Sequence, residues 1–289
     1  MKRIAIQGEL GSFHDIAAHQ YFEGEQIQII CCSTFEQVFE NIKRDPTCIG
    51  MTAIENTIAG SLLHNYELLR DSGTTVVGEH KLHISHCICC LPDDDWDTIT
   101  EVHSHPVALM QCRQYLSNHP TLKAVEADDT AGAAQYISEF QLRGMAAICH
   151  AEAARMHGMK ILENNIEDNK HNFTRFLVVC NPMKADFLRP LEKANKASLV
   201  FSLPHEEGKL SQVLSILSFY KINLTKIQSL PIIGREWEYM FYVDVTYDSL
   251  TRYRQSIDAI IPLTRELKVL VEYSEAPSAP VNSITPTLG

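Results

Sequence analysis

Two residues with distinct chemistry, Thr174 and Arg175, stand at the start of a run of strand-forming apolar residues in the segment "NFTRFLVV". A guanidinium can form a bidentate pair with a carboxylate, and a hydroxyl can donate a hydrogen bond. Successive side chains on a strand point to opposite faces, so both residues serve one ligand only if the segment is kinked or still a loop. The alternative is an ordinary strand whose arginine forms a structural salt bridge.

A second polar segment, "ENTIAGS", follows a predicted strand and precedes a predicted helix. Asn56 can both donate and accept hydrogen bonds, Glu55 and Thr57 flank it, and Gly60 lets the chain turn into the helix. This is the composition of a loop that approaches a ligand closely. An Asx-turn with a glycine hinge explains the same residues equally well.

Two further segments place polar residues where helices begin. Ser104 in "SHPVALMQC" is predicted to be the N-cap of a helix that carries Gln111 about two turns further along. Asp129 and Thr130 open another helix in "DDTAG". Helix N-termini offer free N–H groups and partial positive charge, so several of them around one cleft would bind an anion without many lysines. The competing explanation is that these polar residues only cap their helices. For Gln111 the alternative is a solvent-exposed position on its helix.

The segment "HKLHISHCICC" has His83, Cys87 and Cys89 on one predicted strand face, which suggests a zinc site. No second pair of ligands stands at metal-site spacing elsewhere in the sequence, so a buried central strand and no metal is the preferred interpretation. The nine cysteines are an odd number, and several lie in apolar, strand-like surroundings. We therefore expect reduced thiols rather than a disulfide framework.

The elements that must position these residues alternate between short strands and helices over about the first 180 residues. This alternation predicts a mostly parallel α/β architecture, with binding sites where helices begin beyond strand ends. One stretch, residues 74–92, is long for a single strand. It is predicted either to cross between two lobes or to bend at Gly78 and Glu79.

The pattern changes after this α/β part. Residues 184–195 lie in a polar, proline-containing segment and are predicted to be a linker. Residues 196–273 show the order β-α-β-β-α-β, which is that of a ferredoxin-like fold. Residues 274–289 contain three prolines and little apolar surface, which predicts a disordered tail.

Bulk properties narrow the class of protein. The 289 residues suffice for two domains with cores of their own, and 45% of them are hydrophobic. The formal net charge of -11 provides no long-range attraction for nucleic acid or an anionic membrane. No stretch approaches the roughly 18 apolar residues of a membrane span, and the first residues do not form a signal peptide. We expect a cytoplasmic protein with neither nucleic acid nor membrane as a partner.

Six segments, taken together and in order, resemble the prephenate dehydratase family: "GSFHDIAA", "IENTIAGS", "SHPVALMQC", "DDTAGAA", "AAICHAEAARMHG" and "NFTRF". With the C-terminal β-α-β-β-α-β region, which is similar to an ACT regulatory domain, the resemblance covers about the first 273 residues. It implies a catalytic domain of two α/β lobes, similar to type II periplasmic binding proteins, at residues 1–183. The first lobe would comprise about residues 1–78 and 160–183, the second about residues 79–159, and the ACT domain residues 196–273.

The resemblance also implies an activity. Members of the family convert prephenate to phenylpyruvate, water and carbon dioxide in L-phenylalanine biosynthesis, and they need no metal or organic cofactor. Thr174 would donate a proton or a strong hydrogen bond to the departing hydroxyl, Arg175 would supply positive charge, and Glu55 is an alternative acid. The substrate-binding positions that the resemblance implies are Asn56, Thr57, Gly60, Ser104, Gln111, Asp129, Thr130 and Phe176.

Some positions depart from the family pattern. His14 and Thr57 stand where serine is usual, and the ACT motifs that usually read "GALV" and "ESRP" are "GKLS" and "QSLP" here. L-Phenylalanine is still the expected effector, because backbone groups near Gly208 can hold an amino acid. Its site, between subunits of a homodimer or homotetramer, is predicted at Gly208, Leu210, Asn223, Leu224, Gln228 and Ser229. The alternatives are an arogenate dehydratase and a non-catalytic amino-acid sensor on the same scaffold.

Overall fold

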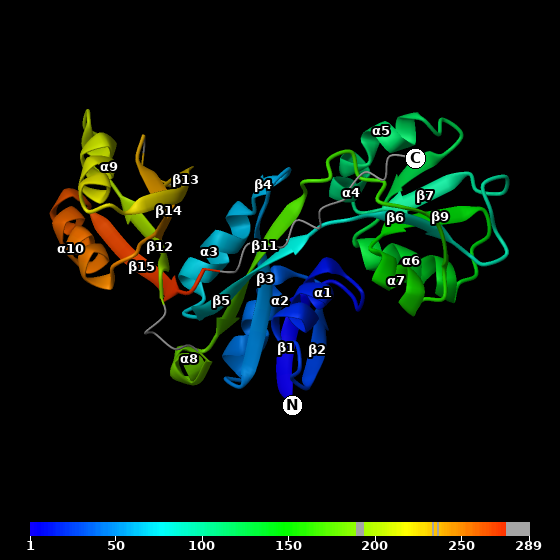
Figure 1. Cartoon of the computed structure of the whole chain (residues 1–289), viewed down its shortest axis with the longest axis horizontal. Helices are drawn as coiled ribbons and strands as arrows, with labels where there is room; N and C mark the ends of the chain where they lie inside the picture. The colour runs from blue at the N-terminus through cyan, green and yellow to red at the C-terminus, as the bar shows by residue number, and fades with distance from the viewer. Residues whose placement is uncertain (189–193, 233, 236, 276–289) are drawn as a thin grey trace, which may run out of the picture. The chain divides into compact units, whose positions relative to one another are not determined.

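A computed structural model describes residues 1–188, 194–232, 234, 235 and 237–275 (Figure 1). The chain forms two compact units. The first contains residues 1–68 and 80–177, and the second contains residues 69–79 together with the described residues from 178 onward. None of the helices in the described ranges combines the length and apolarity that a membrane-spanning segment needs.

The first sheet is built from strands that are apolar over most of their length. Its order is β2 (Ile27–Cys32), β1 (Lys2–Gln7), β3 (Cys48–Asn56), β11 (Phe173–Cys180) and β5 (Thr75–His83), and the short β4 (Gly60–Ser61) pairs with β3. Strand β1 lies between β2 and β3 and is parallel to both, and its residues 4–6 are fully buried. Helices α1 (Phe13–Tyr21), α2 (Phe35–Arg44) and α3 (Leu63–Asp71) connect its strands, as expected for a parallel sheet with covered faces.

The second sheet has the order β10 (Lys160–Asn164), β6 (Cys87–Cys90), β9 (Met145–Cys149), β7 (Glu101–Ser104) and β8 (Lys123–Glu126). Helices α6 (Thr130–Glu139) and α7 (Ala151–Met156) pack on one face, while α4 (Pro106–Gln111) and α5 (Arg113–Ser117) pack on the other (Figure 1). Alternation along β6 therefore directs Cys87 and Cys89 toward α6 and α7, and Ile88 and Cys90 toward α4.

Two stretches of chain cross between these sheets. The stretch at residues 74–92 forms β5 in the first sheet and β6 in the second, so the predicted crossing is confirmed. The break falls at residues 84–86 rather than at Gly78 and Glu79, because both of those residues are buried within β5. The chain returns through residues 165–172. Because β10 pairs with β6, residues 160–164 belong to the second sheet and not, as predicted, to the first lobe.

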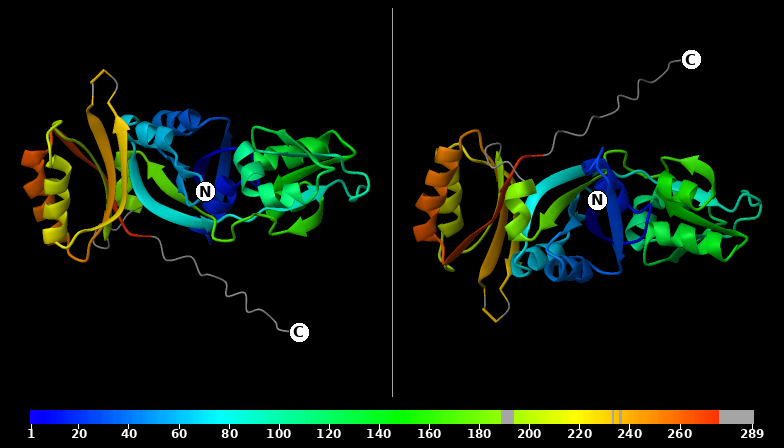
Figure 2. Two further views of the ribbon diagram at one scale, coloured as in Figure 1. Left: turned by 90° about the horizontal axis from the view of Figure 1, so that it is seen from above. Right: turned by 90° about the horizontal axis from the view of Figure 1, so that it is seen from below.

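The last part of the chain has the order β12 (Lys196–Ser202), α9 (Lys209–Phe219), β13 (Asn223–Pro231), β14 (Tyr239–Thr246), α10 (Leu250–Ile260), β15 (Glu266–Tyr273). These strands form an antiparallel sheet in the order β13-β14-β12-β15, and both helices cover one of its faces (Figure 2). Buried side chains of β12, β14, α9 and α10 form a core of their own. This is the β-α-β-β-α-β order that the sequence predicted.

The connection before this region is partly helical. Helix α8 (Pro182–Leu188) occupies the beginning of the predicted linker at 184–195, and residues 189–193 of that linker lie outside the described residues. The predicted tail, 274–289, lies outside them from residue 276 onward. The domain limits as such stay predictions.

Candidate active site

A cavity of about 280 Å³ lies within the first unit, and its wall combines residues from both sheets and their helices. Phe13, Phe35 and Phe176 supply large apolar surfaces. Small-molecule sites usually combine such surfaces with a few converging polar groups. The polar members of the wall are Gln7, Ser12, His14, Asn56, His86, His105, Gln111, Asp128, Asp129, Thr130 and Thr174.

Asn56 orients Thr174 in this wall. Asn56 Nδ2 donates a hydrogen bond to Thr174 Oγ1 over 2.9 Å, while Asn56 Oδ1 accepts from the backbone N–H groups of Ile58 (2.9 Å) and Ala59 (2.8 Å). The segment is thus an Asx-turn, and the turn fixes which end of the amide faces Thr174. Because Thr174 Oγ1 accepts from Asn56, its own hydrogen is available to donate into the cavity.

Asn56 also belongs to a closed ring of three amides. Its Nδ2 donates to Asn172 Oδ1 over 2.8 Å, Asn172 Nδ2 donates to Gln111 Oε1 over 2.9 Å, and Gln111 Nε2 returns to Asn56 Oδ1 over 3.5 Å. All three side chains are at most 7% exposed. Each amide fixes the orientation of the next, so the ring is rigid without containing any charge. Gln111 is therefore a buried group of the cavity rather than a solvated helix residue.

His86 extends this ring and was not predicted as a site residue. Its Nε2 donates to Gln111 Oε1 over 2.9 Å, because that oxygen already accepts from Asn172. Burial lowers the pKa of His86, and the hydrogen bond to Gln111 opposes this only in part. His86 is therefore neutral, and its Nδ1 is an acceptor without a hydrogen-bond partner in the described part of the chain. The apolar run "CICC" that follows it made this segment read as a plain buried strand.

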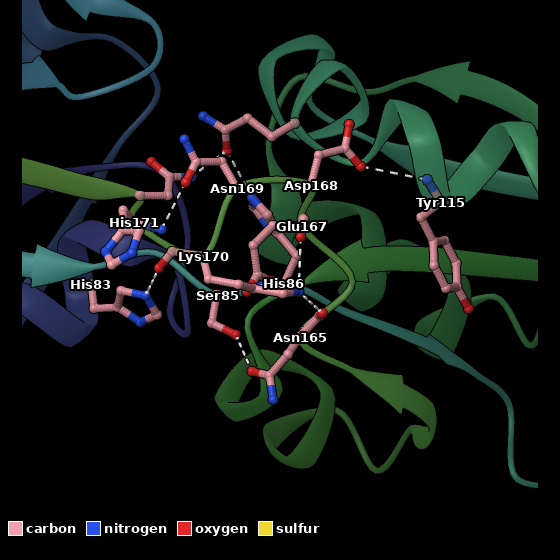
Figure 3. A network of polar contacts seen from close by, with 12 residues as sticks. His83, Ser85, His86, Tyr115, Asn165, Glu167, Asp168, Asn169, Lys170 and His171 are labelled. Atoms are coloured by element: carbon pink, nitrogen blue, oxygen red, sulfur yellow. Dashed lines mark hydrogen bonds and ion pairs between the residues drawn. The ribbon is translucent and has the colours of Figure 1, made fainter. Parts of the chain in front are cut away.

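Hydrogen bonds between the two crossing segments hold His86 and Asn172 in place. Ile84 N–H donates to Asn172 O over 2.8 Å, and the N–H of Ile166 donates to His86 O over 3.0 Å. His86 N–H in turn donates to the buried Glu167 carboxylate over 2.8 Å, as Figure 3 shows. Asn172 was also missed, although it stands in the polar lead-in to "FTRF", because sequence alone does not show which of several adjacent amides turns inward.

Thr174 and Arg175 lie on opposite faces of β11. Thr174 and Phe176 line the cavity, and Arg175 does not. Arg175 Nη1 instead lies 3.6 Å from Glu55 Oε2, and Glu55 does not line the cavity either. The strand is therefore regular at this point, and its alternation separates the hydroxyl from the cation.

Three helices begin at the cavity. Ser12 is the N-cap of α1, His105 the N-cap of α4 and Asp129 the N-cap of α6, and each of these residues lines the wall. No lysine or arginine is among the described residues of that wall. The first turns of these helices are therefore the candidate source of local positive potential, and anion binding by them stays a prediction.

Ser104 is not the N-cap of α4. Strand β7 continues through Ser104, and the helix begins only at Pro106, which follows the capping residue His105. Ser104 Oγ donates to the backbone oxygen of Ile148 over 2.5 Å and is fully buried. The hydroxyl therefore joins β7 to β9, and Ser104 does not line the cavity.

Besides His86, two titratable groups of the wall have a shifted pKa. Burial lowers the pKa of His14 to about 3, so the imidazole is neutral, and its Nε2 accepts from Ala53 N–H over 3.3 Å. Burial also raises the pKa of Asp129, although the N–H of Gly132 donates to this carboxylate over 2.7 Å and opposes the shift. The cavity thus disfavours charge on its own side chains.

Two other predicted substrate-binding residues shape the loop after β3. Thr57 Oγ1 accepts from Phe173 N–H over 2.9 Å and donates to His171 O over 3.1 Å, so it holds the start of β11. Gly60 has a φ of +82°, in the left-handed region that favours glycine. Neither residue lines the cavity, whereas the neighbouring Ala59 and Leu62 do.

The predicted effector residues lie in the C-terminal region. Gly208, with a φ of +77°, is the N-cap of α9, and Leu210 in the first turn lines a cavity of about 540 Å³ together with Ser211 and Leu214. The remaining residues, Asn223, Leu224, Gln228 and Ser229, belong to β13, which is an edge strand of its sheet.

Comparison with protein families and curated proteins gives one consistent result. Residues 4–184 match the sequence model of the family described as prephenate dehydratase. The arogenate dehydratase/prephenate dehydratase 6 of Arabidopsis thaliana is 35% identical, over 94% of this chain and 68% of its own length. The bifunctional chorismate mutase/prephenate dehydratase of Escherichia coli is 30% identical, over 99% of this chain and 73% of its own. The chain thus spans about two thirds to three quarters of these relatives.

Solved structures agree in fold. A structure described as a quorum-quenching acylase is 28% identical with a TM-score of 0.82, and the match covers 95% of this chain and 98% of that one. The prephenate dehydratase of Arthrobacter aurescens in complex with L-Phe is 23% identical with a TM-score of 0.84, over 96% of this chain and 92% of that one. These likenesses confirm the predicted fold class.

Proposed function

The chain belongs to the prephenate dehydratase family, carbon–oxygen lyases of phenylalanine biosynthesis, and we propose that the cavity around Thr174 is where the substrate loses water and carbon dioxide. Membership confirms the predicted activity and enzyme class. The observation that supports this location is the Asn56–Thr174 hydrogen bond, which leaves a hydroxyl hydrogen available inside a largely apolar cavity.

The proposed chemistry follows from the substrate. Prephenate carries a ring carboxylate and a ring hydroxyl, and the loss of both makes the ring aromatic. The electron pair of the bond to the departing CO₂ enters the ring as the bond to the hydroxyl oxygen breaks, and this oxygen must then be stabilised. Thr174 O–H donates a hydrogen bond to this oxygen. Partial negative charge then develops on Thr174 Oγ1, and the hydrogen bond from Asn56 Nδ2 stabilises it. His86 Nδ1 is an acceptor that positions a donor group of the substrate or of a bound water.

Binding of the dianion is assigned to the helix starts rather than to Arg175. The N-terminal turns of α1 and α6 supply N–H groups and partial positive charge at the cavity. Arg175 and Glu55 act as positioning residues, because their ion pair joins β11 to β3 beside Thr174 and Asn56. Ser104 and Thr57 position β7 and β11 through their bonds to backbone atoms.

Arogenate is the second candidate substrate, and one observation favours it. Arogenate differs from prephenate by an amino group in place of the side-chain keto group, so it carries one positive charge. Asp128 and Asp129 both line a wall that has no lysine or arginine among its described residues. A carboxylate beside a bound ammonium gains attraction, whereas beside a second carboxylate it is repelled. The Arabidopsis relative is named for both activities.

One assay with two arms tests the proposal. Full-length protein is incubated with prephenate, and phenylpyruvate is followed in alkali; the parallel arm uses arogenate and measures phenylalanine. We expect product in the prephenate arm, and the ratio of kcat/KM values assigns the preferred substrate. A Thr174→Ala variant purified identically guards against a contaminating host enzyme. Absence of product in both arms would overturn the assignment of the cavity and leave the non-catalytic sensor as the explanation.

L-Phenylalanine is proposed as the allosteric effector, as the Arthrobacter aurescens complex with L-Phe suggests by analogy. The site would lie at the start of α9 and along the edge strand β13, where a second subunit of a homodimer or homotetramer completes it. Calorimetry on the full-length protein checks this, and an absence of heat with phenylalanine would count against it. A cytoplasmic location likewise remains part of the proposal.

A further inference from the structure

Three thiols converge on one face of the second sheet. Cys87 and Cys89 alternate along β6, and Cys149 lies opposite Cys87 on the antiparallel strand β9. The three sulfur atoms lie within 4.8 Å of one another, and those of Cys89 and Cys149 are 3.6 Å apart. His83, which the sequence placed with Cys87 and Cys89, is exposed, and its ring bonds to Lys170 O. The third side chain near Cys87 and Cys89 is therefore Cys149, supplied by strand pairing, and not His83.

The surroundings of these sulfurs decide what they can bind. Each cysteine is at most 1% exposed, and the cluster is covered by alanines of α6 and α7, among them Ala131, Ala134 and Ala153. A net charge is unfavourable in such an apolar environment. Structural zinc takes four ligands, and the described residues provide no fourth histidine, cysteine or carboxylate at this position. Zinc on three thiolates would also leave one negative charge uncompensated.

We propose that Cys87, Cys89 and Cys149 form a binding site for trivalent arsenic, held as an uncharged tris-thiolate. Arsenous acid, As(OH)₃, is itself uncharged at neutral pH, so it can enter an apolar region. Each S–H and As–OH pair gives one As–S bond and one water, so three thiols yield As(SR)₃ and three waters without oxidation or reduction. The three thiolate charges balance the trivalent centre, and soft sulfur ligands suit a thiophilic element.

The site is independent of the proposed dehydratase roles, because none of the three sulfurs lines the substrate cavity. Binding requires a local opening of the sheet, since the three side chains are buried.

Intact mass spectrometry under non-denaturing conditions tests the site directly. The full-length protein is reduced with a phosphine, freed of small thiols and incubated with sodium arsenite. We expect one adduct whose mass equals one arsenic atom less three hydrogens. An adduct that retains a hydroxyl would show that only two thiols react, and the absence of an adduct would show that the cluster is only a buried apolar contact; either result overturns the proposal.

Variants locate the adduct. Cys89→Ala and Cys149→Ala should each abolish the three-bond adduct, with circular dichroism used to confirm that the variants remain folded. Cys90→Ala is the matched control, because Cys90 is adjacent on β6 and equally buried but faces the opposite side of the sheet. It should bind arsenic like the parent protein. An unchanged adduct in both Cys89→Ala and Cys149→Ala would place the arsenic elsewhere and overturn the assignment.

Discussion

The two faces of β11 use different interactions to hold neighbouring residues. On the cavity face, Thr174 is 9% exposed and is held by the amide of Asn56, a member of a ring that contains no charge. On the other face, Arg175, whose side chain is 10% exposed, pairs with Glu55, whose side chain is 35% exposed. This difference between the two faces shows how a protein with a negative net charge can form a binding site for an anion. Neutral dipoles orient the hydroxyl where water is excluded, and on the other face solvent reaches Glu55 and reduces the desolvation cost of its carboxylate.

The largest predicted effect separates these two faces. Thr174→Val removes the hydroxyl but keeps the shape of the side chain, and it should lower kcat by about 10²- to 10⁴-fold, the usual contribution of a general acid. Arg175→Met keeps the length of the side chain and should lower kcat by less than about tenfold, because Arg175 does not line the cavity. Steady-state kinetics with prephenate measures both. A larger loss in Arg175→Met than in Thr174→Val would reverse the proposed division of roles.

The second prediction tests whether Asn56 acts through its amide donors or only through its turn. Asn56→Asp keeps an oxygen that accepts from the N–H groups of Ile58 and Ala59, but it removes the donors to Thr174 and Asn172. We expect kcat to fall about 10²-fold, as for the loss of one preorganised donor in an active site. Asn56→Ala, which also removes the turn, should be less stable by a further ~1–3 kcal/mol. Full activity in Asn56→Asp would assign Asn56 a purely structural role.

The sequence predicted the outline of this site but not its inner wall. The resemblance carried by the ordered motifs named Asn56, Gln111, Asp129, Thr130, Thr174 and Phe176 as binding or catalytic positions, and all six line the cavity. The alternation of side chains along a strand also predicted that Thr174 and Arg175 point to opposite faces unless the strand is kinked, and the strand is regular. His86 and Asn172 were missed because their role depends on two crossing segments, about 80 residues apart in sequence, that bond to each other.

Other differences have local physical causes. Ser104 satisfies the usual pattern of an N-cap, but His105 can also accept from the helix, and the strand bond of Ser104 to Ile148 decides between them. Strand β10 belongs to the second sheet because its residues pair with β6. No sequence pattern within residues 160–164 identifies β6 as the partner strand. Hydrophobic periodicity describes a local segment, so it does not show which distant strands pair with each other.

The third prediction concerns the exclusion of charge from the cavity face, where His14 packs edge-on against Phe176 with ring centroids 5.0 Å apart. The pKa of His14 is lowered from 6.5 to about 3. Between these two pH values, His14 is therefore protonated in the unfolded chain and neutral in the folded chain. The free energy of unfolding should therefore fall as the pH drops, by up to about 1.4 kcal/mol per pH unit from this residue.

His14→Asn isolates this contribution, because asparagine can accept from Ala53 N–H but does not titrate. Urea unfolding of both proteins at pH 7 and pH 5 gives the difference in slope. The parent protein should lose about 2 kcal/mol more than the variant over that interval. Equal losses would mean that His14 is protonated in the fold, and the cavity face would then tolerate charge.

The smallest predicted effect is on the other face, where a double-mutant cycle of Glu55→Gln and Arg175→Met measures the ion pair itself. The Nη1–Oε2 distance of 3.6 Å and the partial exposure of Glu55, against 10% for the Arg175 side chain, place this pair between a surface salt bridge and a fully buried one. The coupling in the free energy of unfolding should therefore be about 0.5–1 kcal/mol and should shrink in high salt. A coupling of several kcal/mol that is insensitive to salt would mean that the pair is desolvated. The ion pair on the face opposite the cavity would then be as buried as the amide ring on the cavity face. The contrast between the two faces of β11 would no longer hold.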